Sequence, residues 1–384
     1  MKPSPNRTCS GCGKHLYSDN SSGKCAKCLY APGAHTPADA VPPPTPEEQL
    51  AADRDARQAK SRYDELKSKY DEALTMIDRQ SFALDWLDQI RNATPSTFTL
   101  TPHSGSGTSE AVPVIVASDW HSEERVLPAQ VSGLNAHNLD INERRITRFF
   151  QASHNLIKNH LNPGVTIHTV VLALLGDFIT GQIHEAENAE NNELMPIPAI
   201  MRVQDMIKKG IDFYLNNSTY KYIIPCKVGN HTRITKRVRS ASETAHSLET
   251  LMYAYLAAQY QNEPRVQFVM DDGYHTYLNI YDKKLRFHHG HAIQYQGGIG
   301  GLFIPAFKAV SQWDKAIRAD LDVFGHFHQT KDGGKFMCNG SLIGFNAFAV
   351  RIKADFEVPQ QSLFMVDKKR GITCKWPIYV EKTW

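Results

Sequence analysis

The chain has 384 residues, which is more than one average domain holds, and its 41% hydrophobic and 22% charged residues are typical of a soluble globular protein. No apolar stretch approaches the roughly 18 residues that a membrane span needs, and the N-terminus lacks the apolar core of a secretory signal, so we expect a cytoplasmic protein without a membrane span. The formal net charge of +3 neither requires nor excludes a nucleic-acid partner.

The first expected element is a small zinc-ribbon-like module in residues 1–32. Two C-x-x-C pairs stand there, and a reducing cytoplasm favours thiolate metal ligands over disulfides. Four thiolates can close a tetrahedral Zn²⁺ shell, and so short a segment has little core to hold it folded without metal. We therefore expect one structural zinc, held by Cys9, Cys12, Cys25 and Cys28. The alternatives are free thiols, a redox-active pair, or His15 in place of one thiolate.

A proline-rich linker is expected at residues 33–44, followed by a long helix at residues 45–93. Thr45 suits the N-cap, Pro46 the first helical position, and Glu48 completes a capping box. Apolar residues then recur at alternating spacings of three and four, as in a coiled-coil seam: Ala52, Ala56, Ala59, Tyr63, Leu66, Tyr70, Ala73, Ile77, Leu84 and Leu87. The helix is expected either to pack on the chain's own globular domain or to form a homodimer.

Residues 94–111 are polar and rich in turn-forming residues, so we expect a second linker there. Residues 112–384 have the texture of an α/β domain, because short apolar runs alternate with stretches of helical period. The runs expected to form buried strands are Val112–Ala117, Val170–Leu175, Tyr222–Val228 and Leu321–Phe324. The alternating pattern from Ser362 to Trp384 is expected to add strands to the sheet.

Side chains that can bind metals follow the apolar runs one after another. They are Asp119 and His121 in a D-x-H motif, Asp177 in G-D, Asn230 and His231 in G-N-H, His289 in H-G, and His326 and His328 in G-H-x-H. In layered α/β folds, ligands bind at the ends of the strands. A carboxylate can bridge two divalent cations, and imidazoles suit Mn, Fe and Zn. The set therefore suits two metals rather than one.

This order of five motifs resembles the calcineurin-like metallophosphoesterase superfamily over about residues 113–345. It is most similar to the DNA-repair nuclease branch of SbcD type, although the N-terminal ribbon and helix are not part of that pattern. The resemblance implies a four-layer α-β-β-α sandwich with a dinuclear metal site at the strand ends. It also implies phosphoester hydrolysis with two divalent transition metals, for which manganese is expected and iron, nickel or zinc are the alternatives.

The resemblance also assigns roles to single residues. One metal would be held by Asp119, His121, Asp177 and His328, and the other by Asp177, Asn230, His289 and His326. Asp177 would bridge the two, and His231 would be the general acid that protonates the leaving oxygen. His289 matches the ligand position because it precedes a glycine, whereas its neighbours His288 and His291 are expected beside the ligands or in the core.

Two positions depart from the family's pattern. Thr180 stands three residues after Asp177, where the family often has an acidic residue that orients the motif histidine. Thr232 follows His231, where the family often has Glu or Asp. Both departures count against the protein-phosphatase branch and leave the ligand positions unchanged.

Four cations lie within seven residues just after the G-N-H motif: Arg233, Lys236, Arg237 and Arg239. Such a run can bind successive phosphates of a polynucleotide, or it can be a solvated start of the following helix. Together with the ribbon and the helix, it favours a metal-dependent nuclease that acts on DNA rather than RNA. The alternative is a phosphodiesterase or phosphatase for nucleotides and other small phosphoesters, and a non-catalytic scaffold is a third hypothesis.

Overall fold

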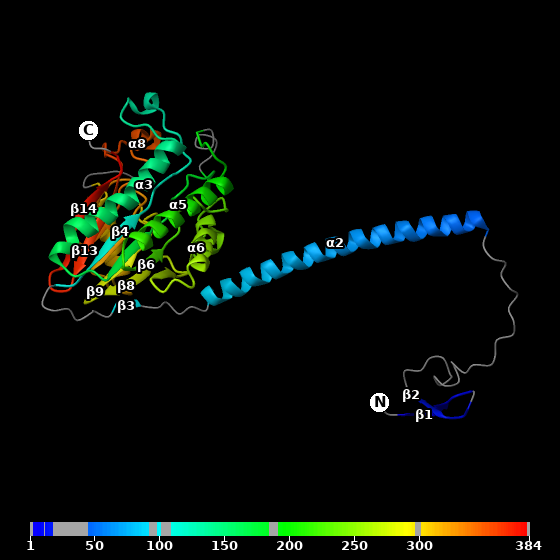
Figure 1. Ribbon diagram of the computed structural model, residues 1–384. Coiled ribbons are helices and arrows are strands. Elements are labelled where there is room, and N and C mark those ends of the chain that lie inside the picture. Colours follow the sequence, from blue (N-terminus) through cyan, green and yellow to red (C-terminus); the bar gives the residue numbers. More distant parts are fainter. Residues whose placement is uncertain are drawn as a thin grey trace. The chain divides into compact units, whose positions relative to one another are not determined.

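The computed structural model describes residues 3–10, 12–17, 45–91, 98–100, 109–183, 191–295 and 301–381 (Figure 1). The chain divides into two compact units, Met1–Phe82 and Ala83–Trp384. The linker expected at residues 33–44 lies outside the described residues, as do Cys25 and Cys28.

The first unit contains a small hairpin and most of a long helix. Strands β1 (Pro3–Thr8) and β2 (His15–Tyr17) pair antiparallel. Helix α2 spans Pro46–Arg91, and the capping box expected at its start is confirmed. The backbone nitrogen of Thr45 donates to Glu48 Oε2 at 2.8 Å, and the backbone nitrogen of Glu48 donates to Thr45 Oγ1 at 3.3 Å. Residues 45–76 are all exposed.

Within the described residues, the second unit is built around two six-stranded sheets. The first sheet has the order β14-β13-β4-β5-β6-β7. Its strands β4 to β7 are parallel, and β13 is antiparallel to both β4 and β14. Their bounds are β4 Ala111–Ala117, β5 Thr169–Leu174, β6 Lys221–Cys226, β7 Val266–Met270, β13 Gln360–Asp367 and β14 Gly371–Tyr379.

The second sheet has the order β11-β12-β10-β9-β8-β3. Strand β10 is parallel to both β9 and β12, whereas β8 runs antiparallel to β9. The bounds are β3 Phe98–Leu100, β8 Thr276–Ile280, β9 Lys283–Phe287, β10 Leu321–Phe324, β11 Lys331–Asp332 and β12 Phe336–Cys338.

The helices of the second unit stand between these strands along the chain. They are α3 Leu139–Asn155, α5 Pro196–Asn217, α6 Leu248–Gln259, α7 Phe303–Trp313 and α8 Ala347–Ile352. Helix α3 continues as a π-helical turn, Leu156–Leu161, and a 3-10 turn, Asn162–Gly164; further 3-10 turns are Pro128–Val131 and Thr244–His246. Among the described residues, no helix combines the length and the apolarity that a membrane crossing requires.

Three apolar cores stack these elements into four layers. Helices α3, α5 and α6 cover one face of the first sheet (Figure 1), where Phe149 and Ile207 pack with Leu172. Between the two sheets, Val114 and Val171 meet Leu285 and Val323. Behind the second sheet, α7 packs on β10 and β12 through the side chains Ala306, Val310, Phe324 and Phe336. The α-β-β-α sandwich implied by the resemblance is therefore confirmed.

The expected strands correspond to β4, β5, β6 and β10, and the C-terminal strands correspond to β13 and β14. The linker expected at residues 94–111 is wrong for Phe98–Leu100, which pairs in parallel with β8 as strand β3. A three-residue strand at a sheet edge is stabilised by pairing with its partner strand rather than by its own sequence pattern. The turn-forming residues around it in the sequence therefore predicted a linker. Helix α5 was also not expected from the sequence.

Candidate metal centre

The five motifs meet because their strands end at the same edges of the two sheets. Strands β4, β5 and β6 lie side by side in parallel, so Asp119, Asp177 and Asn230 follow neighbouring strand ends. In the second sheet, β9 and β10 are also parallel neighbours, which places His289 next to His326. The rings of these two histidines lie 5.2 Å apart. Chain topology thus brings groups from five separate segments together.

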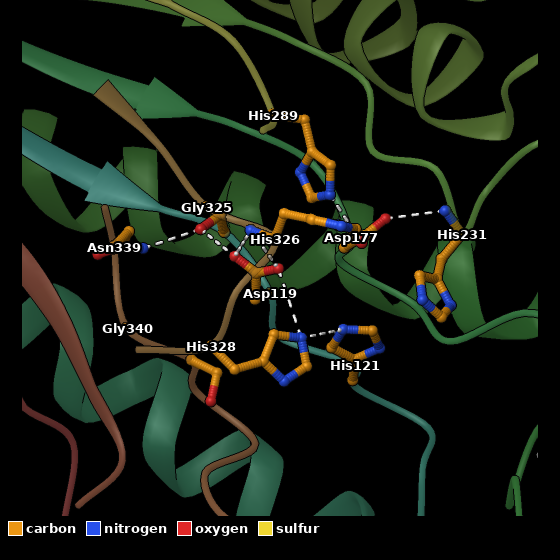
Figure 2. Close-up of polar contacts among 12 residues, drawn as sticks. Asp119, His121, Asp177, His231, His289, Gly325, His326, His328, Asn339 and Gly340 are labelled. Atoms are coloured by element: carbon orange, nitrogen blue, oxygen red, sulfur yellow. Dashed lines mark hydrogen bonds and ion pairs between the residues drawn. The ribbon is translucent and has the colours of Figure 1, made fainter. Parts of the chain in front are cut away.

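Five of the expected ligands have a backbone conformation that residues other than glycine seldom adopt. Positive φ angles occur at Asp119 (55°), His121 (45°), Asp177 (54°), His326 (71°) and His328 (56°). Such residues cost conformational energy and persist where the surrounding structure holds them, most often at functional sites. The sharp turns after the strands bend the chain so that these side chains converge (Figure 2).

The glycines of the motifs are required by close packing between the turns. A Cβ atom at Gly229 would lie 2.0 Å from Asp177 Oδ1, and one at Gly325 would lie 2.2 Å from Asp119 Oδ2. A Cβ atom at Gly176 would lie 2.1 Å from the backbone nitrogen of Gly229. Any side chain at these positions would push a ligand away, so glycine precedes the ligand in the G-D, G-N-H and G-H-x-H motifs.

Carboxylates and imidazoles form overlapping groups whose ligand atoms lie within 4.8 Å of one another. One group is Asp119, His121 and His328; a second is Asp177, His289 and His326; a third is His121, Asp177 and His231. The first two groups match the two expected metal sites, without Asp177 in the first and without the amide of Asn230 in the second. Buried clusters of this kind are consistent with a dinuclear metal site.

Asn230 adds a buried oxygen to the second group. Its side chain follows β6, next to the turn that carries Asp177, and the residue is 8% exposed. Within the part of the chain that the structure describes, its Oδ1 accepts no hydrogen bond. A buried polar atom without a partner is rare in native proteins. A metal ligand is one role that explains it.

The hydrogen bonds of the histidines test whether the site suits a cation. His289 Nδ1 donates to the carbonyl oxygen of Leu175 at 2.7 Å, so in the neutral imidazole Nε2 carries a lone pair. That Nε2 lies 2.8 Å from Asp177 Oδ2, and His121 Nε2 lies 3.0 Å from His328 Nε2 (Figure 2). Lone pairs that face each other at such distances repel unless a proton or a metal lies between them. A divalent cation can take the place of such a proton, so the donor set fits divalent cations.

The pKa values of the site reflect carboxylates and imidazoles that are buried in close contact. Burial opposes charging of His289, but the carboxylates of Asp177 and Asp119 raise the pKa of its imidazole to about 10. Burial also opposes ionisation of Asp177, yet His289 holds the pKa of this carboxyl well below its usual range. Burial raises the pKa of Asp119 to about 7, although His289 opposes the rise. Metal cations would supply the positive charge that these carboxylates lack.

Two buried glutamates that sequence reasoning missed hold the turns in place. Glu123 accepts from the backbone nitrogens of Thr180 at 3.0 Å and Gly181 at 2.7 Å. Glu249 accepts from the backbone nitrogens of Phe178 at 2.9 Å and Gly229 at 2.7 Å, and so ties the G-D turn to the G-N-H turn. Burial raises the pKa of each carboxyl to about 7. No motif marks either residue; the only signal is that Glu123 closely follows the D-x-H motif.

Asp119 is held by further polar groups behind the site (Figure 2). Its Oδ2 accepts from Ser118 Oγ at 2.5 Å, and the backbone nitrogen of His326 lies 3.0 Å from both carboxylate oxygens. Asn339 Nδ2 donates in turn to Ser118 Oγ at 2.9 Å. These contacts keep the carboxylate in one orientation.

His288 and His291 lie outside the ligand groups. His288 is buried, with Nε2 3.3 Å from Asp322 Oδ1 and its ring stacked on Phe324. His291 Nε2 lies 2.9 Å from Glu243 Oε1. Both positions agree with the expectation that these histidines lie in the core or beside the ligands.

The basic run forms an irregular loop between β6 and α6. Lys236, Arg237 and Arg239 are exposed. Arg233 is partly buried against the site: its Nη1 donates to the carbonyl oxygen of Asn230, and its Nε donates to that of Thr235 at 3.2 Å. The expected alternative, a solvated helix start, is wrong because α6 begins only at Leu248.

Of the four cysteines expected to bind zinc, the structure describes Cys9 and Cys12, which lie in the turn between β1 and β2. The backbone nitrogen of Cys9 donates to the carbonyl oxygen of Lys14 at 2.7 Å, and that of Gly13 donates to the carbonyl oxygen of Cys9 at 2.9 Å. Gly13 has a φ of 73°, and Cys12 stands just before it in the turn. Because Cys25 and Cys28 lie outside the described residues, the structural zinc stays a prediction.

Comparisons with known proteins find only solved structures of low sequence identity and low TM-score. No family model and no curated protein matches the sequence. A Streptococcus pneumoniae protein described as a predicted phosphoesterase is 12% identical, with 70% of this chain and 98% of that chain covered and a TM-score of 0.28. Vps29 of Entamoeba histolytica in complex with Zn²⁺ is 14% identical (69% and 99% covered, TM-score 0.26). A putative 5'-nucleotidase of Staphylococcus aureus is 11% identical (72% and 56%, TM-score 0.29). Likenesses at these levels of identity and TM-score show nothing about the function of this chain.

Proposed function

We propose that this protein is a metal-dependent phosphoesterase of the calcineurin-like type, and that its substrate is a phosphodiester of DNA. The observation that carries the proposal is the convergence of Asp119, His121 and His328 with Asp177, His289 and His326, whose ligand atoms lie within 4.8 Å in each group. These residues come from four of the five motifs that occur in the order of that superfamily, and the four-layer sandwich is the fold that the superfamily implies.

The ligand groups divide between two cations in this proposal. Asp119, His121 and His328 would hold one, His289, His326 and Asn230 the other, and Asp177 would bridge them. When bound at such a site, two divalent cations would neutralise the anionic phosphate and would make water a nucleophile at neutral pH. Manganese is the proposed metal, because the mixed carboxylate, amide and imidazole donors suit it.

His231 is proposed as the general acid for the leaving oxygen. Its Nδ1 donates to the carbonyl oxygen of Thr180 at 2.8 Å, and its backbone nitrogen donates to Asp177 Oδ1 at 2.8 Å. These two contacts fix the ring beside the bridging carboxylate (Figure 2). With Nδ1 on the carbonyl, the proton that His231 passes on would come from Nε2.

The basic loop favours a polymeric substrate over a small one. Arg233 lies close enough to the site that Asp177 raises its pKa against the larger, lowering effect of burial. Lys236, Arg237 and Arg239 continue from it along the exposed loop. Cations in a row beside a phosphoester site can bind phosphates on either side of the cleaved bond.

The proposed function is tested by incubating the protein with Mn²⁺ and end-labelled single- and double-stranded DNA, with bis-p-nitrophenyl phosphate as a small substrate. Cleavage of DNA supports the nuclease. Cleavage of the dye ester and of neither polymer would instead identify a phosphodiesterase for small phosphoesters. Absence of all three activities, together with absence of bound metal, would leave the non-catalytic scaffold.

We expect the double variant Arg237→Ser, Arg239→Ser to weaken DNA binding while hydrolysis of bis-p-nitrophenyl phosphate stays unchanged. Each lost phosphate contact should make the slope of log affinity against log salt shallower by about 1. Binding is measured by fluorescence anisotropy between about 50 and 200 mM salt. Lys315→Ser with Arg318→Ser removes the same charge from another exposed segment and should leave affinity unchanged. Equal losses in both double variants would mean that the loop is not a specific phosphate site.

We further propose that helix α2 joins two copies of the chain. Its seam residues are spaced as in a coiled coil, and Tyr63, Leu66 and Tyr70 are 66%, 68% and 63% exposed. Leu66→Glu with Tyr70→Glu should convert a dimer into a monomer in light scattering after gel filtration, because buried like charges oppose pairing. Ser68→Glu, on the opposite side of the helix, should keep the dimer. A wild-type protein that is monomeric at all concentrations would contradict the proposal.

A further inference from the structure

Thr180 contacts two histidines of the metal centre at once. The residue is 1% exposed and lies in the turn that follows Asp177. Its hydroxyl oxygen is 2.9 Å from His121 Nδ1, and its carbonyl oxygen accepts from His231 Nδ1 at 2.8 Å. The rings of His121 and His231 lie 4.8 Å apart at 90°, and Figure 2 shows them side by side. One residue thus holds a proposed ligand and the proposed general acid.

The hydroxyl of Thr180 has a second partner, Glu124. Thr180 Oγ1 lies 3.1 Å from Glu124 Oε2, which in the ionised carboxylate can only accept a hydrogen bond. The hydroxyl proton therefore points to Glu124, and the hydroxyl oxygen must accept from His121. A proton is then placed on His121 Nδ1, and the lone pair is left on Nε2, the atom next to His328.

Glu124 is itself held in one orientation. Asn346 Nδ2 donates to its Oε1 at 2.9 Å. Asn346 cannot turn its amide over without loss, because its Oδ1 accepts from the backbone nitrogen of Ala349 at the start of α8. With Glu124 ionised, the direction of the hydrogen bonds along Asn346, Glu124, Thr180 and His121 is determined from one end to the other.

We infer that Thr180 and Glu124 are positioning residues that hold His121 in the tautomer able to bind a metal. The inference rests on the proposed function, because it takes His121 as a ligand. A histidine ligand commonly donates its second ring nitrogen to a carboxylate or carbonyl. Here the carboxylate of Glu124 acts on His121 through the hydroxyl of Thr180. Glu124 lies in the segment just after the D-x-H motif.

The inference is tested with Mn²⁺ titrations of the full chain, in which the electron paramagnetic resonance signal of free Mn²⁺ reports binding. Thr180→Val removes the hydroxyl at nearly constant volume and should weaken one of the two Mn²⁺ sites about 10- to 100-fold. Thr180→Ser keeps the hydroxyl and should bind nearly as the wild type does.

Glu124→Gln is a second variant that preserves shape. Because Asn346 must still donate to an oxygen, the glutamine NH₂ group would face Thr180 and reverse the hydroxyl. His121 Nδ1 would then accept, its proton would move to Nε2, and binding at the same site should weaken about 10- to 100-fold. Thr232→Val is the matched control, because this threonine is also 1% exposed and its Oγ1 pairs only with Ser247 Oγ, at 2.7 Å, among the contacts seen.

The outcomes distinguish failure of the positioning role from failure of the proposed function. Wild-type affinity in both Thr180→Val and Glu124→Gln would overturn the positioning role while leaving the metal centre intact. Equal weakening in Thr232→Val would also overturn it, since a general effect of packing would then explain the loss. A wild-type protein that binds no Mn²⁺, Fe²⁺, Ni²⁺ or Zn²⁺ at these residues would instead contradict the proposed function.

Discussion

Asp177→Asn is expected to lower the divalent metal bound beyond the predicted structural zinc from two equivalents to at most one, and to reduce phosphodiester hydrolysis at least about 10³-fold. Asp177 belongs to two of the three ligand groups, and its two oxygens already face different partners. Oδ2 lies 2.8 Å from His289 Nε2, and Oδ1 accepts from the backbone nitrogen of His231. Asparagine keeps one oxygen and brings an NH₂ group and no charge, so it cannot bridge two cations.

Asparagine is a better replacement for Asp177 than alanine, because of the backbone conformation at this position. Asp177 has a φ of 54°, a conformation that asparagine tolerates better than alanine does. The turn should therefore survive, and the loss can be attributed to the carboxylate. Metal is counted by mass spectrometry after dialysis, and rates are measured with Mn²⁺ and bis-p-nitrophenyl phosphate. Asp282→Asn alters a carboxylate with a side chain 68% exposed and should change neither quantity. Two equivalents of metal in Asp177→Asn would refute the bridging role.

His231→Ala is expected to keep both metals and to lose about 10²- to 10⁴-fold in rate on a substrate with a poor leaving group. The loss should be much smaller with a p-nitrophenolate leaving group, which departs without a proton. Rates on a DNA phosphodiester and on bis-p-nitrophenyl phosphate are therefore compared for the same variant.

His231 also lies in one ligand group with His121 and Asp177, so metal content decides between its two possible roles. Full metal content with a selective loss on poor leaving groups identifies a general acid. Loss of one metal equivalent would instead make His231 a ligand. His160→Ala, an exposed histidine outside all ligand groups, should leave rate and metal content unchanged. Full activity of His231→Ala on DNA would refute both roles.

The sequence alone determined the parts of the site that depend on local order. Each apolar run was followed by a carboxylate, an amide or an imidazole, and strands β4, β5, β6 and β10 form where these runs were expected. Parallel strands of one sheet end at a common edge, so the convergence of Asp119, Asp177 and Asn230 followed from the pattern. The helix start at Thr45 was equally visible, because a capping box is a contact between residues only three apart.

Only the tertiary structure decided what supports the ligands. From the sequence, Thr180 was interpreted as the loss of an acidic residue, yet its hydroxyl connects His121 to Glu124, a residue 56 positions from Thr180 along the chain. Glu249 reaches both the G-D and the G-N-H turns from α6. Contacts of this kind depend on how separate elements pack, and no periodicity or motif records them. Strand β3 was likewise not visible in the sequence, because this short strand depends on pairing with the edge strand β8.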